Sequence, residues 1–355
     1  MKKIFYRTIP LLFLLLFSGC SSTKEKFTVH LIEDEMFDTV IQFIQYTEDE
    51  EEFEKNTEIL KNEFSYYHRL FDKYKDYPGV ANIKTINDAA GNVPVTVEQP
   101  VIDLLLFAKE MHEKTEGKNN IALGAVLKVW HNYRGMYDDP EEYNEDNTDS
   151  KIPDLNELEA LRAHTDLSKL LIDDQSNTVF IEDPLMSIDV GGVAKGYATE
   201  LVAKKLEEAG VTDFAINAGG NVRVSGHSYG SDDKKRPWNT GIQDPFISTN
   251  PSVANIHITS GSLVSSGNYQ RYYWYDGKKY SHIIDNDTLF PSFLYAQVSI
   301  YHKDSGTADY LSTELFLLPV DEGRKLAEKF DAEVLWMEMD GTIHKTSDFF
   351  EMKTP

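Results

Sequence analysis

Residues 187–198, SIDVGGVAKGYA, constrain the fold of this chain more than any other segment. Apolar residues lead into Asp189, a glycine pair follows, and Lys195 stands at the start of a helix that we expect to begin near Val193. Glycines let backbone amides and carbonyls approach an anion or a cation closely, and the positive end of a helix attracts anions. The segment therefore favours a site for a phosphate and a metal, although such a turn also serves ordinary packing.

The N-terminal residues have the pattern of a bacterial export signal. Lys2, Lys3 and Arg7 precede an apolar run over residues 9–17, and a Ser-Gly pair then leads into Cys20, the only cysteine. The run is too short for a membrane-spanning helix, and a cysteine after small residues resembles the lipidation site of bacterial lipoproteins. An exported protein with an unmodified cysteine is the alternative, and a single cysteine excludes an intramolecular disulfide.

On this basis we expect three parts in the chain. Residues 1–19 form a signal peptide, residues 20–27 form the lipidated cysteine and a short tether, and residues 28–355 form one domain. The protein would lie outside the cytoplasm, anchored by its lipid to the bacterial cell membrane.

The chain is strongly acidic, which limits the partners that we expect. It holds 35 Lys and Arg against 59 Asp and Glu, a formal net charge of −24 at pH 7. Removal of residues 1–19 would leave 32 basic residues against the same 59 acidic ones, a net charge of −27. We therefore expect no nucleic-acid partner. The acidic tract over residues 138–149 lacks the spacing and the glycine of a calcium loop, so we expect an exposed loop there.

Periodic patterns predict a mixed α+β fold. We expect helices over residues 50–74, from 100 onward, over 155–161, from 193 to 210, from 307 onward and over 322–330. We expect strands over residues 36–46, 214–216, 222–224, 253–258, 271–275, 279–284 and 297–301, and a final pair around 340–341. Strands and helices do not alternate regularly, and the chain has no Walker loop or G-x-G-x-x-G motif. We therefore predict a single unit with two lobes, not a Rossmann or P-loop fold.

A second motif, residues 307–315, has the pattern of a metal site. On a helix, Asp309, Ser312 and Thr313 share one face, because residues three and four positions apart are neighbours. One carboxylate beside hydroxyls offers the oxygen ligands that Mg²⁺ prefers, and Mg²⁺ usually completes its shell with waters and substrate phosphates. The structural alternative is that Thr307 begins the helix and Asp309 stabilises its positive end.

Residues 280–285 place His282 and Asp285 near the end of an expected strand. A lone histidine in such a place usually has a structural role. Beside a metal, however, His282 becomes a candidate general base.

Five motifs occur in the order found in one known family: residues 189–197 (DVGGVAKGY), 217–221 (NAGGN), 241–245 (GIQDP), 281–285 (SHIID) and 307–313 (TADYLST). From about Met36 to the last expected strand, the chain therefore resembles the ApbE-family FAD:protein FMN transferases. The resemblance implies that FAD is split at its pyrophosphate and that AMP leaves. It also implies that the FMN half is joined by a phosphoester to a threonine hydroxyl of an exported acceptor protein, and that Mg²⁺ is required.

The resemblance assigns binding roles to residues through the matching motifs. The implied FAD site comprises Met36, Tyr74, Ala122, Leu123, Gly124, Asp189, Lys195 and Ile284. Metal ligation falls to the carbonyl of Gly192 and to the side chains of Asp309 and Thr313. Two departures from the family pattern are Ser312, where a second Asp is common, and the turn over residues 285–291.

The catalytic groups that we expect are Lys195, His282 and Asp285. Lys195 and the metal would neutralise charge on the pyrophosphate, because phosphoryl transfer depends on such stabilisation. His282 would take the proton of the acceptor threonine, with Asp285 or the substrate itself as alternatives.

Other functions fit the same residues. In an FAD pyrophosphatase, water would replace the threonine and release FMN and AMP from an identical site. A lipid-anchored protein that binds flavin without chemistry is a second alternative, although a metal-binding helix face has no purpose there. A solute-binding lipoprotein is less favoured, because two similar lobes joined by crossing strands are not apparent in the sequence.

Overall fold

The computed structural model describes residues 24–353, apart from 32, 138–141, 143, 147–148, 247–250 and 270. The predicted signal peptide, Cys20 and much of the acidic tract lie outside the described residues. The helices are α1 (Glu50–Phe71), α2 (Ile83–Asp88), α3 (Gln99–Lys114), α4 (Gly124–Met136), α5 (Leu155–Arg162), α6 (Ala194–Glu208), α7 (Ser305–Phe316) and α8 (Val320–Lys329), with the 3₁₀ helices η1 (Glu33–Asp38) and η2 (Leu167–Lys169). Within these described ranges, no helix has the length and the apolar composition to cross a membrane.

An eight-stranded antiparallel sheet forms the centre of the fold, with strand order β1-β2-β6-β7-β12-β15-β16-β17. Its strands are β1 (Glu25–Leu31), β2 (Ile41–Thr47), β6 (Phe214–Ala218), β7 (Asn221–Ser225), β12 (Ser260–Gly267), β15 (Tyr295–His302), β16 (Glu333–Glu338) and β17 (Ile343–Lys345). The smaller sheets are formed by β10 (Trp238–Gln243), β11 (Ser252–Ile258) and β18 (Glu351–Met352); by β3 (Val95–Thr96), β5 (Thr178–Ile181) and β4 (Leu170–Asp173); by β13 (Tyr272–Tyr275) and β14 (Lys278–Ser281); and by β8 (Ser228–Tyr229) and β9 (Lys235–Arg236). The predicted α+β class is therefore confirmed.

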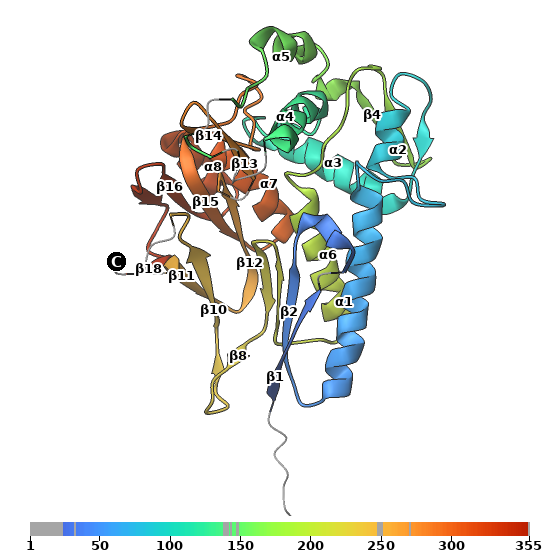
Figure 1. Ribbon diagram of the computed structural model, residues 1–355. Coiled ribbons are helices and arrows are strands. Elements are labelled where there is room, and N and C mark those ends of the chain that lie inside the picture. The colour runs from blue at the N-terminus through green and yellow to red at the C-terminus, as the bar shows by residue number, and fades with distance from the viewer. Residues whose placement is uncertain are drawn as a thin grey trace, which may run out of the picture.

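Helices α1, α6 and α7 cover one face of the large sheet (Figure 1). In α1, the side chain of Asp49 caps the first turn, and three glutamates stand at the positive end of the helix. Phe53, Leu60 and Phe64 recur on one buried face of this helix and belong to the main core. The aromatic stripe of residues 50–74 is therefore core.

The opposite face of the large sheet packs on the small sheet of β10, β11 and β18. Alternate residues of β12 divide between the two faces, since Val264 lies in the core on the helix side and Leu263 in the core on the small-sheet side. Trp238, Ile256 and Phe350 fill the second core. The large sheet is thus buried on both faces, which holds its strand ends in place.

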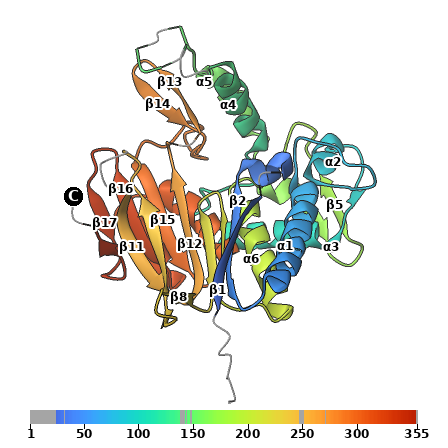
Figure 2. The same ribbon diagram turned by 60° about the horizontal axis from the view of Figure 1, so that its bottom comes forward.

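Helices α4 and α5 and the hairpin β13–β14 form a lobe that stands above the sheet (Figure 2). Trp130 of α4 lies at its centre and donates its ring N–H to the Leu289 carbonyl at 2.8 Å. The turn of the hairpin has Asp276 and Gly277 in left-handed conformations, with φ of 48° and 66°, as a two-residue hairpin loop requires. The hairpin predicted over residues 271–284 is therefore confirmed.

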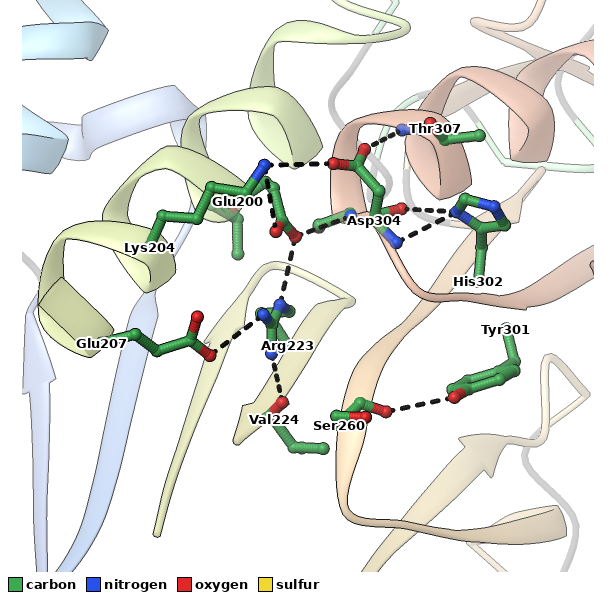
Figure 3. A network of polar contacts seen from close by, with 12 residues as sticks. Glu200, Lys204, Glu207, Arg223, Val224, Ser260, Tyr301, His302, Asp304 and Thr307 are labelled. Atoms are coloured by element: carbon green, nitrogen blue, oxygen red, sulfur yellow. Dashed lines mark hydrogen bonds and ion pairs between the residues drawn. The ribbon is translucent and has the colours of Figure 1, made fainter. Parts of the chain in front are cut away.

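A buried network of charged groups fixes the start of α7 against α6 and β7 (Figure 3). The Glu200 carboxylate accepts from Arg223 Nε at 3.1 Å and from the backbone N–H of Ser305 at 2.9 Å. Asp304 caps α7 by accepting from the Thr307 N–H at 2.8 Å. Because buried charges are stable only when they are paired, this network specifies one placement of α7.

The structure corrects two expectations about the elements and contains elements that the sequence patterns do not predict. The strand predicted over residues 36–46 begins only at Ile41, because Phe37 and Asp38 have φ of 55° and 51°, outside the strand region. The tether predicted over residues 20–27 is too long, since β1 begins at Glu25 and pairs with β2. Helix α4 and strand β12 are not predicted by the sequence patterns at all.

We predict that Gly196→Ala destabilises the fold by about 2 kcal/mol, because overpacking forces the backbone to shift. A Cβ atom at this position in α6 would lie 2.3 Å from the Asp309 Cβ and 2.4 Å from the Ser305 carbonyl oxygen of α7. Equilibrium unfolding in denaturant measures the change. The matched control is Gly135→Ala in α4, where a Cβ would meet no atom within 4 Å. The control should gain about 0.5–1 kcal/mol, since alanine favours the helix, and equal stability of the two variants would contradict the prediction.

Candidate active site

A cavity of about 520 Å³ lies where α6, α7 and the end of β12 meet η1, α4 and the residues flanking the β13–β14 hairpin. This volume lies within the range of roughly 300–1,000 Å³ typical of small-molecule sites. The predicted site residues that line it are Tyr74, Leu123, Asp189, Gly192, Lys195, His282, Ile284, Asp309 and Thr313. Gly219 of the motif at residues 217–221 lines the cavity as well, so folding brings together residues from four of the five motifs.

Four predicted site residues do not line the cavity. Met36 and Ala122 are buried in the main core. Gly124 packs against Ser187, where a Cβ atom would come within 2.3 Å of the carbonyl oxygen. Asp285 Oδ1 accepts hydrogen bonds from the backbone N–H groups of Asp287 at 2.7 Å and Thr288 at 2.9 Å, and so stabilises a turn. Core packing and turn formation occupy these side chains, and His282 is the predicted base that reaches the cavity.

The cavity is basic although the chain is acidic. Six of its lining residues are Lys or Arg and four are Asp. The whole chain, by contrast, holds 35 Lys and Arg against 59 Asp and Glu. A concave site with an excess of one sign of charge concentrates ligands of the opposite sign. The cavity is therefore suited to an anionic ligand.

Lys73 and Asp189 form an ion pair on one wall of the cavity. Burial lowers the pKa of Lys73, but the attraction of Asp189 outweighs it and leaves the pKa above its usual value. Burial likewise raises the pKa of Asp189, and Lys73 together with the Gly191 N–H overcomes it, so this pKa is lowered. The ammonium of Lys73 lies 4.8 Å from the Tyr74 ring centroid, and that ring lies 5.6 Å from His131. Aromatic faces beside a cation suit a flat heteroaromatic ligand.

Lys195 and Asp309 face each other from α6 and α7. The backbone N–H of Gly196 donates to Asp309 Oδ2 at 2.7 Å. Burial lowers the pKa of Lys195 and raises the pKa of Asp309, and the attraction between the two charges offsets only part of these shifts. An anion beside Lys195 and a cation beside Asp309 would each stabilise a charge that the fold leaves partly uncompensated.

His282 is a neutral base within the cavity. Burial, Arg134 and Arg271 lower its pKa to about 3, so the ring carries no charge at neutral pH. Its Nδ1 lies 3.2 Å from the Arg271 carbonyl oxygen and donates its proton there. This hydrogen bond leaves Nε2 as the basic nitrogen, which is the tautomer that a general base needs.

The oxygen atoms around Gly192 fit a small hard cation. A Cβ atom placed on Gly192 would lie 3.4 Å from Thr313 Oγ1 and 3.1 Å from Asn119 Oδ1, so both oxygens converge beside this glycine. The carboxylate of Asp309 lines the same cavity. In the part of the chain that the structure describes, no three His, Cys, Asp or Glu side chains cluster as metal ligands do. The donor set is one of carbonyl, hydroxyl and carboxylate oxygens, which suits Mg²⁺.

Several lining residues are absent from the predicted site. Lys73 follows no motif and would be found only through its neighbour Tyr74. Arg134 donates to His131 Nδ1 at 2.9 Å from one turn along α4, a helix that the sequence patterns do not predict. Arg271 comes from the start of the hairpin. Only the packing of the lobe on the sheet brings Arg134 and Arg271 to the cavity.

Comparisons with known proteins agree with this geometry. The sequence model described as the ApbE family matches residues 37–336. A protein of Klebsiella pneumoniae (strain 342) named FAD:protein FMN transferase is 29% identical over 78% of this chain and 82% of its own length. A protein of the same name from Treponema pallidum (strain Nichols) is 30% identical over 70% of this chain and 68% of its own. The crystal structure of the ApbE protein from Thermotoga maritima shares the fold, with a TM-score of 0.75, 26% identity and coverage of 93% of this chain and 100% of that one.

We predict that the affinity for pyrophosphate falls as the pH rises. The fall should begin at a lower pH than that at which an ordinary lysine loses its proton. The reason is that burial lowers the pKa of Lys195, whose positive charge we expect to attract the anion. Calorimetric titration should show a loss approaching tenfold per pH unit once Lys195 loses its proton. Lys195→Arg keeps the charge at every pH tested and should remove this dependence.

Lys118→Arg serves as the matched control, because the pKa of Lys118 is raised by Asp287 and Asp285 against its burial. This variant should keep the pH profile of the unaltered protein. Identical profiles for the unaltered protein and Lys195→Arg would show that another group controls binding.

Proposed function

The chain belongs to the ApbE family, and from this membership we propose that it transfers FMN from FAD to a threonine hydroxyl of exported acceptor proteins. The reaction requires Mg²⁺ and releases AMP. The curated proteins similar to this chain carry the name FAD:protein FMN transferase, which supports the transfer itself. The chemistry of the cavity supports the finer assignments.

One observation carries the proposal: a cationic side chain, an oxygen donor set and a neutral base share a single cavity. Lys195 offers charge to a pyrophosphate, and Gly192, Asp309 and Thr313 offer oxygen ligands. His282 offers a nitrogen that is unprotonated at neutral pH. Transfer of a phosphoryl group to a hydroxyl needs these three functions together.

The proposed reaction forms one P–O bond and breaks another. The threonine oxygen attacks the phosphorus of the FMN half, and the bridging oxygen of the pyrophosphate leaves with AMP. Lys195 binds the pyrophosphate oxygens and stabilises the charge that grows on the leaving phosphate. Mg²⁺, held by Gly192, Asp309 and Thr313, would neutralise phosphate charge and help to orient the pyrophosphate for displacement.

His282 Nε2 accepts the proton of the threonine hydroxyl in this scheme. The hydrogen bond from Nδ1 to the Arg271 carbonyl keeps the ring in the required tautomer. Arg134 and Arg271 keep the ring neutral before the reaction, and the departing negative charge favours the protonated ring afterwards. The Tyr74 and His131 rings beside Lys73 supply flat surfaces for a ring of FAD.

We also propose that the protein acts outside the cytoplasm. Residues 1–19 are the signal, Cys20 carries the lipid, and β1 begins five residues later at Glu25. Such a short tether would hold the enzyme close to the membrane surface. Acceptors would then be exported or membrane-anchored proteins that present a threonine within reach of the cavity.

The test of the proposal is the intact mass of an acceptor. We expect an exported acceptor mixed with the protein, FAD and Mg²⁺ to gain one FMN, and a chelator or Asp309→Ala to abolish the gain. Asp304→Ser is the matched control, because it replaces the α7 cap with another good cap outside the cavity and should retain transfer. Release of FMN and AMP at constant acceptor mass would favour the hydrolase, and unchanged FAD would refute catalysis.

We predict that His282→Ala lowers the transfer rate by more than tenfold, within the usual contribution of about 10²–10⁴ for a positioned base. Because the pKa of His282 is about 3, the rate of the unaltered enzyme should not fall through loss of this base between pH 5 and 8. Single-turnover kinetics at several pH values measure both effects. A loss below tenfold in His282→Ala would argue against His282 as the base, and a rate of the unaltered enzyme that follows a pKa near 6.5 would contradict the lowered pKa of this ring.

A further inference from the structure

We infer that Asn119 is a positioning residue of the metal site, which holds the Gly192 carbonyl in place and is itself held by Tyr310 and Glu314 of α7. The inference rests on the Mg²⁺-dependent function proposed above. No motif in the sequence points to Asn119, which lies in the connection between α3 and α4.

The side-chain amide of Asn119 has one possible orientation. Its Nδ2 donates to the Gly192 carbonyl at 3.3 Å and to the Tyr310 carbonyl at 3.2 Å. Both partners are acceptors only, so the nitrogen must face them and Oδ1 must point away. None of the residues that the structure describes donates a hydrogen bond to Oδ1, which, like Thr313 Oγ1, lies close to Gly192 at the cavity. The amide therefore clamps a proposed ligand and turns its oxygen to the cavity.

The backbone of Asn119 is fixed equally firmly by α7. Its N–H donates to Glu314 Oε2 at 2.7 Å, and its carbonyl accepts from the Tyr310 hydroxyl at 2.5 Å. The N–H of Lys118 donates to the other oxygen of Glu314 at 3.0 Å. The Glu314 side chain has no exposed surface, and burial raises its pKa, while the N–H groups of Asn119 and Lys118 offset part of that effect. These hydrogen bonds join the α3–α4 connection to α7 as one unit.

The clamp matters because Gly192 precedes α6, which begins only at Ala194. Gly192 follows another glycine, and a glycine pair has more backbone freedom than any other. Asp309 and Thr313 already share the rigid frame of α7. By bonding to both Gly192 and Tyr310, Asn119 ties the third proposed ligand to that same frame. Groups that orient metal ligands in this way typically change metal affinity by about 10–100-fold.

The test is calorimetric titration of Mg²⁺ into the purified protein with ADP present and no acceptor. We expect Asn119→Ala to weaken Mg²⁺ binding by about tenfold or more. Tyr310→Phe removes only the hydroxyl that holds the Asn119 carbonyl, and it should weaken binding in the same direction by less. ADP affinity in the presence of a chelator should not change in either variant. Excess Mg²⁺ should restore FMN transfer by Asn119→Ala.

Asn56→Ala is the matched control for the loss of a buried amide. Asn56 of α1 is 4% exposed and donates to Gln45 Oε1 at 3.1 Å, and neither residue lines the cavity. This variant should lower the unfolding temperature without any change in Mg²⁺ affinity.

Three results would overturn the inference, and they differ in what they say of the proposed function. Unchanged Mg²⁺ affinity in Asn119→Ala would refute the positioning role and leave the function intact. An equal loss of metal-free ADP binding would assign Asn119 to the cavity as a whole. Absence of Mg²⁺ binding by the unaltered protein would refute the inference together with the metal requirement of the proposed function.

Discussion

The close contact between α6 and α7 at Gly196 is the constraint on which the site depends. Only a residue without a side chain allows the Gly196 N–H to donate to Asp309 Oδ2 at 2.7 Å. This contact sets Lys195 beside Asp309 in a region that neither helix could bury alone. Because the Glu200–Arg223 pair fixes the start of α7 against α6 as well, the two helices meet in one register. The placement of charge in the cavity thus follows from helix packing.

The fold holds these charges at a cost that a ligand would relieve. Burial disfavours the charged forms of Lys195 and Asp309, and their mutual attraction compensates this only in part. For Lys73 and Asp189, by contrast, their mutual attraction together with neighbouring groups such as the Gly191 N–H outweighs burial, so their pKa values shift toward the charged forms. Incomplete compensation, as in Lys195 and Asp309, is expected of groups that meet substrate. The well-compensated charges of Lys73 and Asp189 are expected of groups that shape the cavity wall. Fixed charges of this kind stabilise a reaction without reorganisation at the moment of transfer.

How much the sequence reveals depends on whether the signal is local. The turn and helix around Lys195 and the helix face of Asp309 and Thr313 follow from spacing within a few residues, and both are found in the cavity. Met36 and Asp285 belong to the predicted site as well, but the Met36 side chain packs in the core and the Asp285 side chain stabilises a turn. Arg134, Arg271 and Asn119 have no local signal, because each reaches the cavity only through contacts between elements distant in the chain. Periodicity also misses β12, whose small residues alternate weakly between two buried faces.

The two lobes meet at the segment that carries the base. Ile283 packs in the main core and its neighbour Ile284 in the core of the lobe, so the chain passes from one core to the other directly after His282. The lobe is fastened there by Trp130, which donates to the Leu289 carbonyl, and the body by Ser292, which donates to the Phe316 carbonyl at 3.2 Å. The distance between the base and the oxygen donors of α7 is therefore set by the packing of both cores. A ligand that spans this seam contacts both lobes at once, so its binding energy also acts on how the lobes pack.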